Sequence, residues 1–230
     1  HDGVLESGRL LLVDGGGESV EGYCSDHTRT YPVNGKFTDV QKEIYNIVLR
    51  AHGEVKDMIK PGTMYPEIHR ASYLSLAEGL KGIGLIKSTA EDAVDAGAMY
   101  MFMPHGLGHG MGMDVHDLEN IGERSFDFST VADRAAKSAT CIHRGSWRVE
   151  PGTVMSDEPG IYFIPALIDK CRAEGKFNGI VDFDKLDSFR NFGGIRIEDD
   201  VLVTESGSRF IGDKLLPLTV EELEAVIGKE

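Results

Sequence analysis

The chain has 230 residues, of which 41% are hydrophobic and 27% charged, a composition that is typical of a folded domain and excludes a disordered or fibrous chain. A chain of this length can bury roughly 70% of its unfolded surface, which is enough for a substantial core. The formal net charge of −14 argues against a nucleic-acid partner, which needs a basic face, and it leaves carboxylates for a cation site.

The first predicted elements are two strands and a long helix. Residues 9–14 are predicted to form a buried strand, 15–22 a loose glycine-rich hairpin turn, and 23–30 the returning strand. Thr38 starts a capping-box pattern, and the apolar residues that follow keep helical spacing. We therefore expect a hairpin followed by a helix that ends before Pro61.

The later segments continue this alternation. Three further helices are predicted, over residues 66–80, 91–96 and a closing segment that starts at Thr219. Strand-like segments at 153–158 and 195–204 are separated by an insert, 166–191, with helical character, and the polar region 119–148 is predicted as loop. Helices that alternate with hairpin-joined strands, without a linker or repeat, predict an α+β fold in one domain.

Cysteine usage and hydropathy bear on the compartment. Three widely spaced cysteines, Cys24, Cys141 and Cys171, do not form a disulfide framework and favour a reducing, cytoplasmic location. The longest apolar runs, such as residues 10–13, are far shorter than the about 20 residues of a membrane helix, so no membrane association is expected. The chain opens at His1 without an initiator Met, as if upstream sequence had been removed.

Four acidic residues fall in or beside apolar, strand-like segments: Asp14, Asp26, Glu158 and Glu198. A carboxylate in such surroundings is costly unless it is paired or coordinates a cation. Each one alone would most simply be an acid at a strand end, facing solvent or paired with an arginine. Four of them beside an unusual histidine cluster favour a cation site.

The histidine cluster spans residues 105–117, where glycine alternates with larger side chains and leaves imidazoles as the groups to be presented. Histidines four residues apart can hold zinc on a helix, but the glycines argue against a helix here. A glycine-rich phosphate cradle would need a Lys-Ser/Thr partner that this segment lacks. The cluster therefore favours a metal or catalytic site that is neither a helical zinc site nor a phosphate-binding loop.

One imidazole with four carboxylates is too rich in oxygen for a structural zinc site. Such ligands fit a pair of harder divalent ions, Mn²⁺ first, with Co²⁺ or Zn²⁺ able to substitute. Two ions about 3.5 Å apart can activate a shared water at neutral pH, which predicts metal-assisted hydrolysis.

Four motifs along the chain, GYCSDHTRT at 22–30 after Asp14, MPHGLGH at 103–109, DEPGIYF at 157–163 and GGIRIED at 193–199, resemble in order those of the "pita-bread" metallopeptidases, family M24. That family includes methionine aminopeptidase, aminopeptidase P and prolidase. The resemblance covers nearly the whole chain. It implies an antiparallel β-sheet with flanking helices and one catalytic domain over residues 1–230.

The resemblance implies a ligand set for two metal ions. Asp14 would chelate one ion, Asp26 and Glu198 would bridge both, and His109 and Glu158 would complete the second. Glu158 would also move a proton from the attacking water to the leaving nitrogen.

Other matched residues imply a substrate pocket. His105 and His116 match family histidines that line the pocket and stabilise the tetrahedral intermediate or move protons. Tyr162 and Arg196 would flank the site. Arg144 stands where prolidases place an arginine that holds the terminal carboxylate of the dipeptide, a task that suits a planar guanidinium; a solvated loop arginine is the alternative.

The long interval between Glu158 and Glu198 resembles prolidases and related Xaa-Pro peptidases. The resemblance therefore implies an Xaa-Pro dipeptidase acting on proline-containing peptides, with aminopeptidase P as the alternative within enzymes. An inactive module of the same fold that binds peptides or proteins is the alternative of another class, which retention of all five ligand types disfavours. The family also implies a homodimer.

Three departures from the family pattern stand out. The interval between Asp14 and Asp26 is one residue longer than usual, which a hairpin tip or a bulge could absorb. Asp157 adds an acid beside Glu158 where the family has a neutral residue. The family's catalytic fold begins well before the strand that carries Asp14, so we expect the N-terminal portion of the fold to be missing from this chain.

Overall fold

The computed structural model describes residues 3–117, 147–212 and 214–227. Its elements in chain order are β1 (Leu10–Glu18), β2 (Cys24–Pro32), α1 (Asp39–Met58), α2 (Tyr65–Gly82), α3 (Ala90–Asp95), the 3-10 helix η1 (Ala98–Met101), β3 (Val154–Asp157), β4 (Gly160–Tyr162), α5 (Pro165–Ala173), α6 (Phe183–Leu186), the 3-10 helix η4 (Asp187–Phe189), β5 (Gly194–Arg196), β6 (Asp199–Val203), β7 (Ser208–Phe210) and α7 (Val220–Val226). The α+β class and the antiparallel pairing predicted from the sequence are confirmed.

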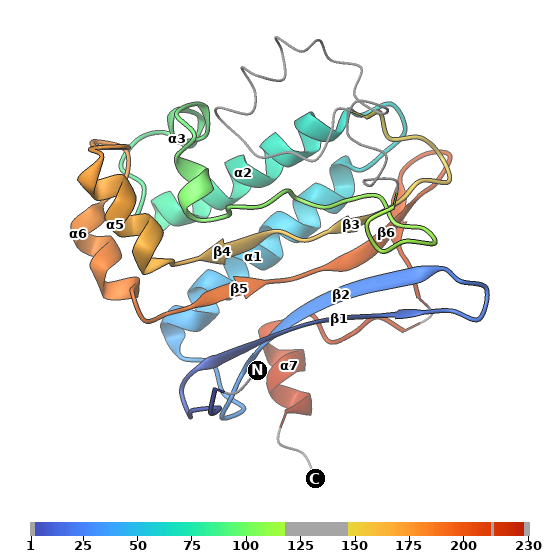
Figure 1. The fold of residues 1–230 in the computed structure, drawn as a ribbon, viewed down its shortest axis with the longest axis horizontal. Coiled ribbons are helices and arrows are strands. Elements are labelled where there is room, and N and C mark those ends of the chain that lie inside the picture. The colour runs from blue at the N-terminus through green and yellow to red at the C-terminus, as the bar shows by residue number, and fades with distance from the viewer. Residues whose placement is uncertain (1–2, 118–146, 213, 228–230) are drawn as a thin grey trace.

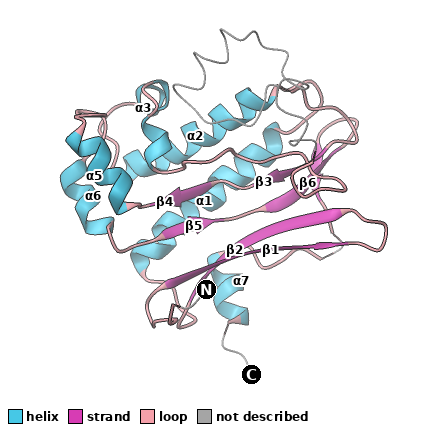
Figure 2. Ribbon diagram, viewed as in Figure 1, coloured by secondary structure: helices cyan, strands magenta, loops and turns pink. Residues whose placement is uncertain are grey.

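The strands form a layer of short antiparallel pairs that the long helices cover on one side (Figure 1). β1 pairs with β2, β4 pairs with β5, and β6 lies between β3 and β7. Helix α1 contacts β3, β4, β5 and β7, and α2 packs on α1. Helices α5 and α6 lie together at one end of the layer (Figure 2). The core therefore sits between the strands and α1.

The buried stripe of α1 explains this packing. Ile44, Val48, Ala51 and Val55 recur at helical spacing and are fully buried. A Cβ on Gly79 of α2 would stand 2.3 Å from the Ile47 side chain, so glycine is what allows the two helices to approach closely. None of the helices in the described ranges is both long and apolar enough to cross a bilayer.

The helix boundaries follow the predicted signals closely. The Thr38 hydroxyl accepts a hydrogen bond from the Gln41 backbone N–H, and the Gln41 side chain accepts one from the Thr38 N–H, at 3.2 and 2.9 Å. Helix α1 ends at Met58, before Pro61, and α2 has Pro66 in its first turn. Thr219 caps α7 as predicted, and no helix forms within residues 103–117.

The predicted hairpin turn is wrong in its position. Gly15, Gly16 and Gly17 lie inside β1, where they pair with the residues from His27 back to Ser25, and the turn falls on residues 19–23. A Cβ on Gly16 would stand 1.9 Å from the Ser25 carbonyl oxygen, so glycine there permits a close backbone approach. The pairing is unbroken on both sides of the tip, so the hairpin tip accommodates the interval between Asp14 and Asp26 without a bulge.

The predicted strand 195–204 is also divided. β5 ends at Arg196 and pairs with β4, whereas β6 begins at Asp199 and pairs with β3 and β7. Between them Glu198 forms an isolated antiparallel bridge with Thr28 of β2. The break lets one segment pair with different neighbours on either side of Glu198.

We predict that Thr38→Ala lowers the free energy of unfolding by about 1 kcal/mol, because it removes the acceptor that satisfies a backbone N–H at the start of α1. Urea unfolding followed by circular dichroism measures the change. Thr38→Ser keeps the hydroxyl and is the matched control. An unfolding midpoint for Thr38→Ala equal to that of the wild type would contradict the importance of this cap.

Candidate metal centre

The hairpin aligns two of the predicted ligands. In the β1–β2 register Asp14 lies opposite Thr28 and Gly16 lies opposite Asp26, so Asp14 and Asp26 are diagonal neighbours on one face of the ribbon. Side chains alternate along a strand, so His27 and Arg29 project from the opposite face. The pairing therefore directs Asp14, Asp26 and Thr28 to the same side.

The loop that carries His109 runs against β3. Glu158 N–H donates to the Leu107 carbonyl at 2.9 Å, and Ser156 N–H donates to the His109 carbonyl at 3.0 Å. A Cβ on Gly108 would stand 2.1 Å from the Ser156 carbonyl oxygen, so only glycine fits at this contact. The alternating glycines therefore let the loop lie close enough to β3 to bring His109 beside Glu158.

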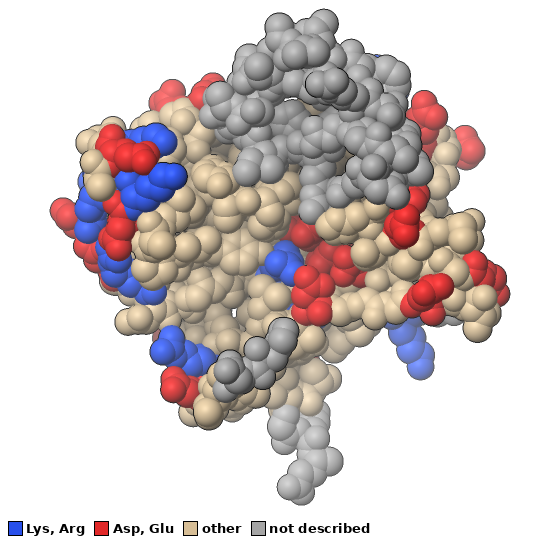
Figure 3. Space-filling view, in the orientation of Figure 1, with Lys and Arg blue, Asp and Glu red and all other residues tan. Residues whose placement is uncertain are grey.

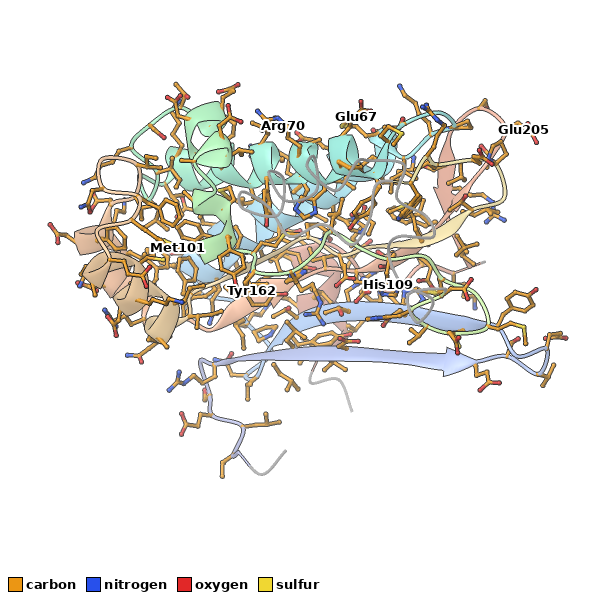
Figure 4. All side chains as sticks on the ribbon, turned by 45° about the horizontal axis from the view of Figure 1, so that its top comes forward. Glu67, Arg70, Met101, His109, Tyr162 and Glu205 are labelled. Carbon is orange, nitrogen blue, oxygen red and sulfur yellow. The ribbon has the colours of Figure 1, made fainter. Side chains whose placement is uncertain are left out.

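The His109 ring is oriented by its own neighbours. Its Nδ1 lies 3.0 Å from the Gly110 carbonyl oxygen, to which a ring N–H donates, and this leaves the Nε2 lone pair for a ligand. Nε2 lies 3.6 Å from Asp26 Oδ2 and 3.6 Å from Glu158 Oε1. His109 itself is 2% exposed. In the view of Figure 4 it lies between α2 and the β1–β2 ribbon.

Three predicted ligands form a compact donor set. One ligand atom from each of Asp26, His109 and Glu198 lies within 4.8 Å of the other two. Glu198 is buried, and its Oε2 accepts a hydrogen bond from the Thr28 hydroxyl at 2.5 Å. Glu158 is held by the Ser156 hydroxyl, which donates to its Oε1 at 3.2 Å.

The electrostatics of these carboxylates favour a cation. Burial and the nearby charge of Glu158 raise the pKa of Glu198 to about 8. Burial and the neighbouring Asp14 raise the pKa of Asp26. Both shifts show that the negative charges are crowded and poorly hydrated. A divalent ion would relieve this repulsion, and two carboxylates with one imidazole are donors that suit Mn²⁺, Co²⁺ or Zn²⁺.

A chain of hydrogen bonds borders the donor set. The Tyr162 hydroxyl lies 3.0 Å from His105 Nε2 and accepts from Arg196 Nη1 at 3.1 Å. Arg196 also pairs with Asp14 through Nη2 and donates from Nε to the Thr28 hydroxyl. The ring of Tyr162 lies over Gly160 and Gly194, where a Cβ would stand 2.8 and 2.4 Å from it. The Tyr162 side chain is labelled in Figure 4.

The structure thus brings together most of the predicted site residues. The His116 and His109 rings lie 4.0 Å apart, and His105 Nδ1 lies 4.0 Å from Glu158 Oε2. Acidic side chains gather beside a basic one near the middle of the face that Figure 3 shows. Asp14 is not one of the three residues of the compact donor set; it is half-exposed, pairs with Arg196 and adjoins Asp26. Arg144 lies outside the described residues.

Sequence reasoning missed the residues that support the ligands. Thr28 and Ser156 bind Glu198 and Glu158 directly, and Arg29 forms a buried ion pair with Asp199 behind them. Thr28 and Arg29 lie inside the motif GYCSDHTRT around Asp26, and their place in this motif is the sequence feature that points to a supporting role. Burial alone would raise the pKa of Asp199, but the Arg29 guanidinium and the His27 and His52 rings close to its carboxylate hold that pKa below its ordinary value.

The antiparallel strands backed by helices, with two carboxylates and a histidine converging from distant segments, agree with the pita-bread metallopeptidase class. Residues 1–205 match metallopeptidase family M24. The chain therefore belongs to this family. The resemblance and the fold predicted from the sequence motifs are confirmed.

Curated relatives agree over nearly the full chain. The Xaa-Pro dipeptidase of Rattus norvegicus is 40% identical over 230 residues, which are 99% of this chain and 44% of the relative. The Xaa-Pro dipeptidase of Homo sapiens is 38% identical over the same shares. The chain thus spans less than half the length of these relatives.

Solved structures show the same partial coverage. Aminopeptidase PepP of Pseudomonas aeruginosa superposes with a TM-score of 0.73 at 34% identity, over 97% of this chain and 42% of that one. Aminopeptidase P of Escherichia coli with the inhibitor Pro-Leu gives a TM-score of 0.70 at 33% identity, over 95% and 41% of the two chains. The fold described above is therefore the part of the pita-bread fold that this chain shares with them.

We predict that Glu198→Gln and Asp26→Asn each weaken the binding of Mn²⁺ or Co²⁺, because each removes a charged ligand. Loss of an outer-shell partner typically weakens metal binding about 10- to 100-fold, and we expect a larger loss here. Isothermal titration calorimetry on the intact protein measures the affinity. Both variants should still fold, since each removes one of several crowded negative charges. Exposed Glu205→Gln is the control and should bind metal normally. Wild-type affinity in either site variant would contradict the ligand assignment.

Proposed function

We propose that this chain forms the catalytic domain of a dinuclear-metal peptidase that hydrolyses Xaa-Pro bonds. The observation that carries the proposal is the convergence of Asp26, His109 and Glu198, with Asp14 and Glu158 beside them, in a member of a metallopeptidase family. The names of the matched relatives support the choice of an Xaa-Pro bond.

In the proposed centre Asp14, Asp26, His109, Glu158 and Glu198 would hold two divalent ions, Mn²⁺ first. Bound there, such ions would activate water at neutral pH and polarise the scissile carbonyl. The acid-rich surroundings would also attract the free amine of a peptide substrate. Crowding of the carboxylates supports the assignment, because it is costly without a cation.

Glu158 is the proposed proton carrier. Its carboxylate is partly exposed, lies 3.6 Å from His109 Nε2, and is oriented by the Ser156 hydroxyl. A carboxylate oriented in this way can accept a proton from the attacking water and deliver it to the leaving nitrogen.

His105 and His116 are proposed to contact the substrate. The Tyr162 hydroxyl fixes the His105 ring on one side of the donor set, and Arg196 fixes Tyr162 in turn. The His116 ring lies against the His109 ring. Imidazoles held in this way can donate hydrogen bonds to an oxyanion as it develops. Arg144 remains a proposed ligand for the terminal carboxylate of a dipeptide.

A dipeptidase is the first proposal because the curated relatives at 38–40% identity over 99% of the chain are Xaa-Pro dipeptidases. Aminopeptidase P is the second candidate, because the solved structures quoted above carry that name. We further propose a homodimer in the cytoplasm. The cytoplasmic location is supported by Cys24 and Cys171, the two cysteines in the described residues, neither of which forms a disulfide.

We predict that dialysis of the intact protein against a chelator abolishes cleavage of an Xaa-Pro dipeptide and that added Mn²⁺ restores it, since the water would no longer be activated without the ion. Release of the free N-terminal amino acid measures the rate, because hydrolysis of the first peptide bond frees that residue from dipeptides and tripeptides alike. Comparison of a Xaa-Pro dipeptide with a Xaa-Pro-Xaa tripeptide separates the two candidate activities, and a dipeptide without proline is the control. If the protein binds metal but cleaves neither proline peptide, the peptidase proposal is wrong and the alternative of an inactive peptide- or protein-binding module is favoured.

A further inference from the structure

Arg29 is a buried cation directly behind the donor set. It lies on β2, three residues after Asp26 and on the opposite face of the strand, and is 2% exposed. A buried guanidinium is costly unless all of its N–H groups find acceptors and its charge is balanced. The acceptors of the Arg29 N–H groups therefore show which parts of the structure this residue holds together.

All three guanidinium nitrogens of Arg29 donate hydrogen bonds. Nη1 donates to the carbonyl oxygens of Thr28 and Glu198, each at 2.9 Å. Nη2 donates to both carboxylate oxygens of Asp199, at 2.8 and 3.0 Å. Nε donates to the Pro217 carbonyl at 2.8 Å. The guanidinium therefore binds three backbone carbonyls and one carboxylate.

The two carbonyls that Nη1 binds are those of the bridge between β2 and the β5–β6 junction. Thr28 N–H donates to Glu198 O at 3.3 Å, and Glu198 N–H donates to Thr28 O at 3.0 Å. Thr28 also holds the Glu198 carboxylate through its hydroxyl. Arg29 thus ties together the backbones of a predicted bridging ligand and of the residue that orients it.

The anionic side of this arrangement is fixed as well. Asp199 is 4% exposed, and His27 Nδ1 and His52 Nε2 lie 3.4 and 3.2 Å from its carboxylate oxygens. The His52 ring stacks on Phe210 at 5.0 Å. Arg29 is therefore linked through Asp199 to His52 of α1, which in turn packs on Phe210 of β7.

We infer that Arg29 is a positioning residue for the metal centre: its guanidinium holds the Thr28–Glu198 bridge so that the Asp26 and Glu198 carboxylates face one another at metal-binding distance. The inference rests on the metal centre of the proposed function but not on the peptidase activity. A lysine would keep the charge, but its single nitrogen cannot reach at once the three carbonyl oxygens and the carboxylate that the three guanidinium nitrogens bind.

The test measures Co²⁺ affinity by calorimetry and the visible absorption spectrum of bound Co²⁺, in the intact protein. We expect Arg29→Lys to weaken Co²⁺ binding about 10- to 100-fold and to change the spectrum, because the outer-shell support of Glu198 is lost. Asp199→Asn, which weakens the hold on Nη2, should act in the same direction. It also keeps the inference testable if Arg29→Lys does not fold.

The matched control separates positioning from general stability. Val94→Ala, on α3, removes buried volume from a helix that packs against α2. It should lower the melting temperature of the metal-free protein but leave Co²⁺ affinity and the spectrum unchanged. Wild-type affinity and spectrum in the folded Arg29 or Asp199 variant would overturn the inference. An equal loss of affinity in Val94→Ala would also overturn it.

Failure of the Arg29 inference can be distinguished from failure of the proposed peptidase function. A wild-type protein that binds Co²⁺ through Glu198, but cleaves no proline peptide, would refute the peptidase while leaving the Arg29 inference to be judged by affinity. A wild-type protein that binds no Co²⁺ would overturn both.

Discussion

Two backbone hydrogen bonds between Thr28 and Glu198 determine the geometry on which the site depends. They join the β1–β2 hairpin to the break between β5 and β6. Asp26 lies two residues before Thr28 on the same face of β2, so the bridge brings its carboxylate to that of Glu198. The two carboxylates would repel each other, and the backbone is what holds them together.

Basic groups on two sides compensate for this crowding without entering the donor set. Arg196 contacts Asp14, Thr28 and Tyr162 on the open side, and Arg29 contacts Asp199 on the buried side. The remaining repulsion persists as the raised pKa of Glu198. Locally unfavourable charge that the rest of the fold tolerates is typical of a functional site. A divalent cation is the partner that would neutralise it.

The sequence motifs predicted the fold class, the capped helices and the group of ligands, because each of these has a local chemical signature. Thr38 and Thr219 bind their own helix starts, and acids in apolar strands stand out by composition. The run Gly15–Gly17 lies in a strand and not in the predicted turn, since glycine is favoured both in turns and where two backbones approach closely. Only the paired strand reveals which of these applies.

The chain by itself therefore determined which residue types could bind metal and where the helices begin, since both depend on neighbours in sequence. Tertiary structure alone decided that the 195–204 segment breaks at Glu198, that Asp14 pairs with Arg196, and that Arg29 lies behind the donor set. The contacts of Arg29 with Glu198 and Asp199 join residues about 170 positions apart. No local pattern encodes such pairs, because they arise only when separate strands meet and must satisfy each other's buried polar groups.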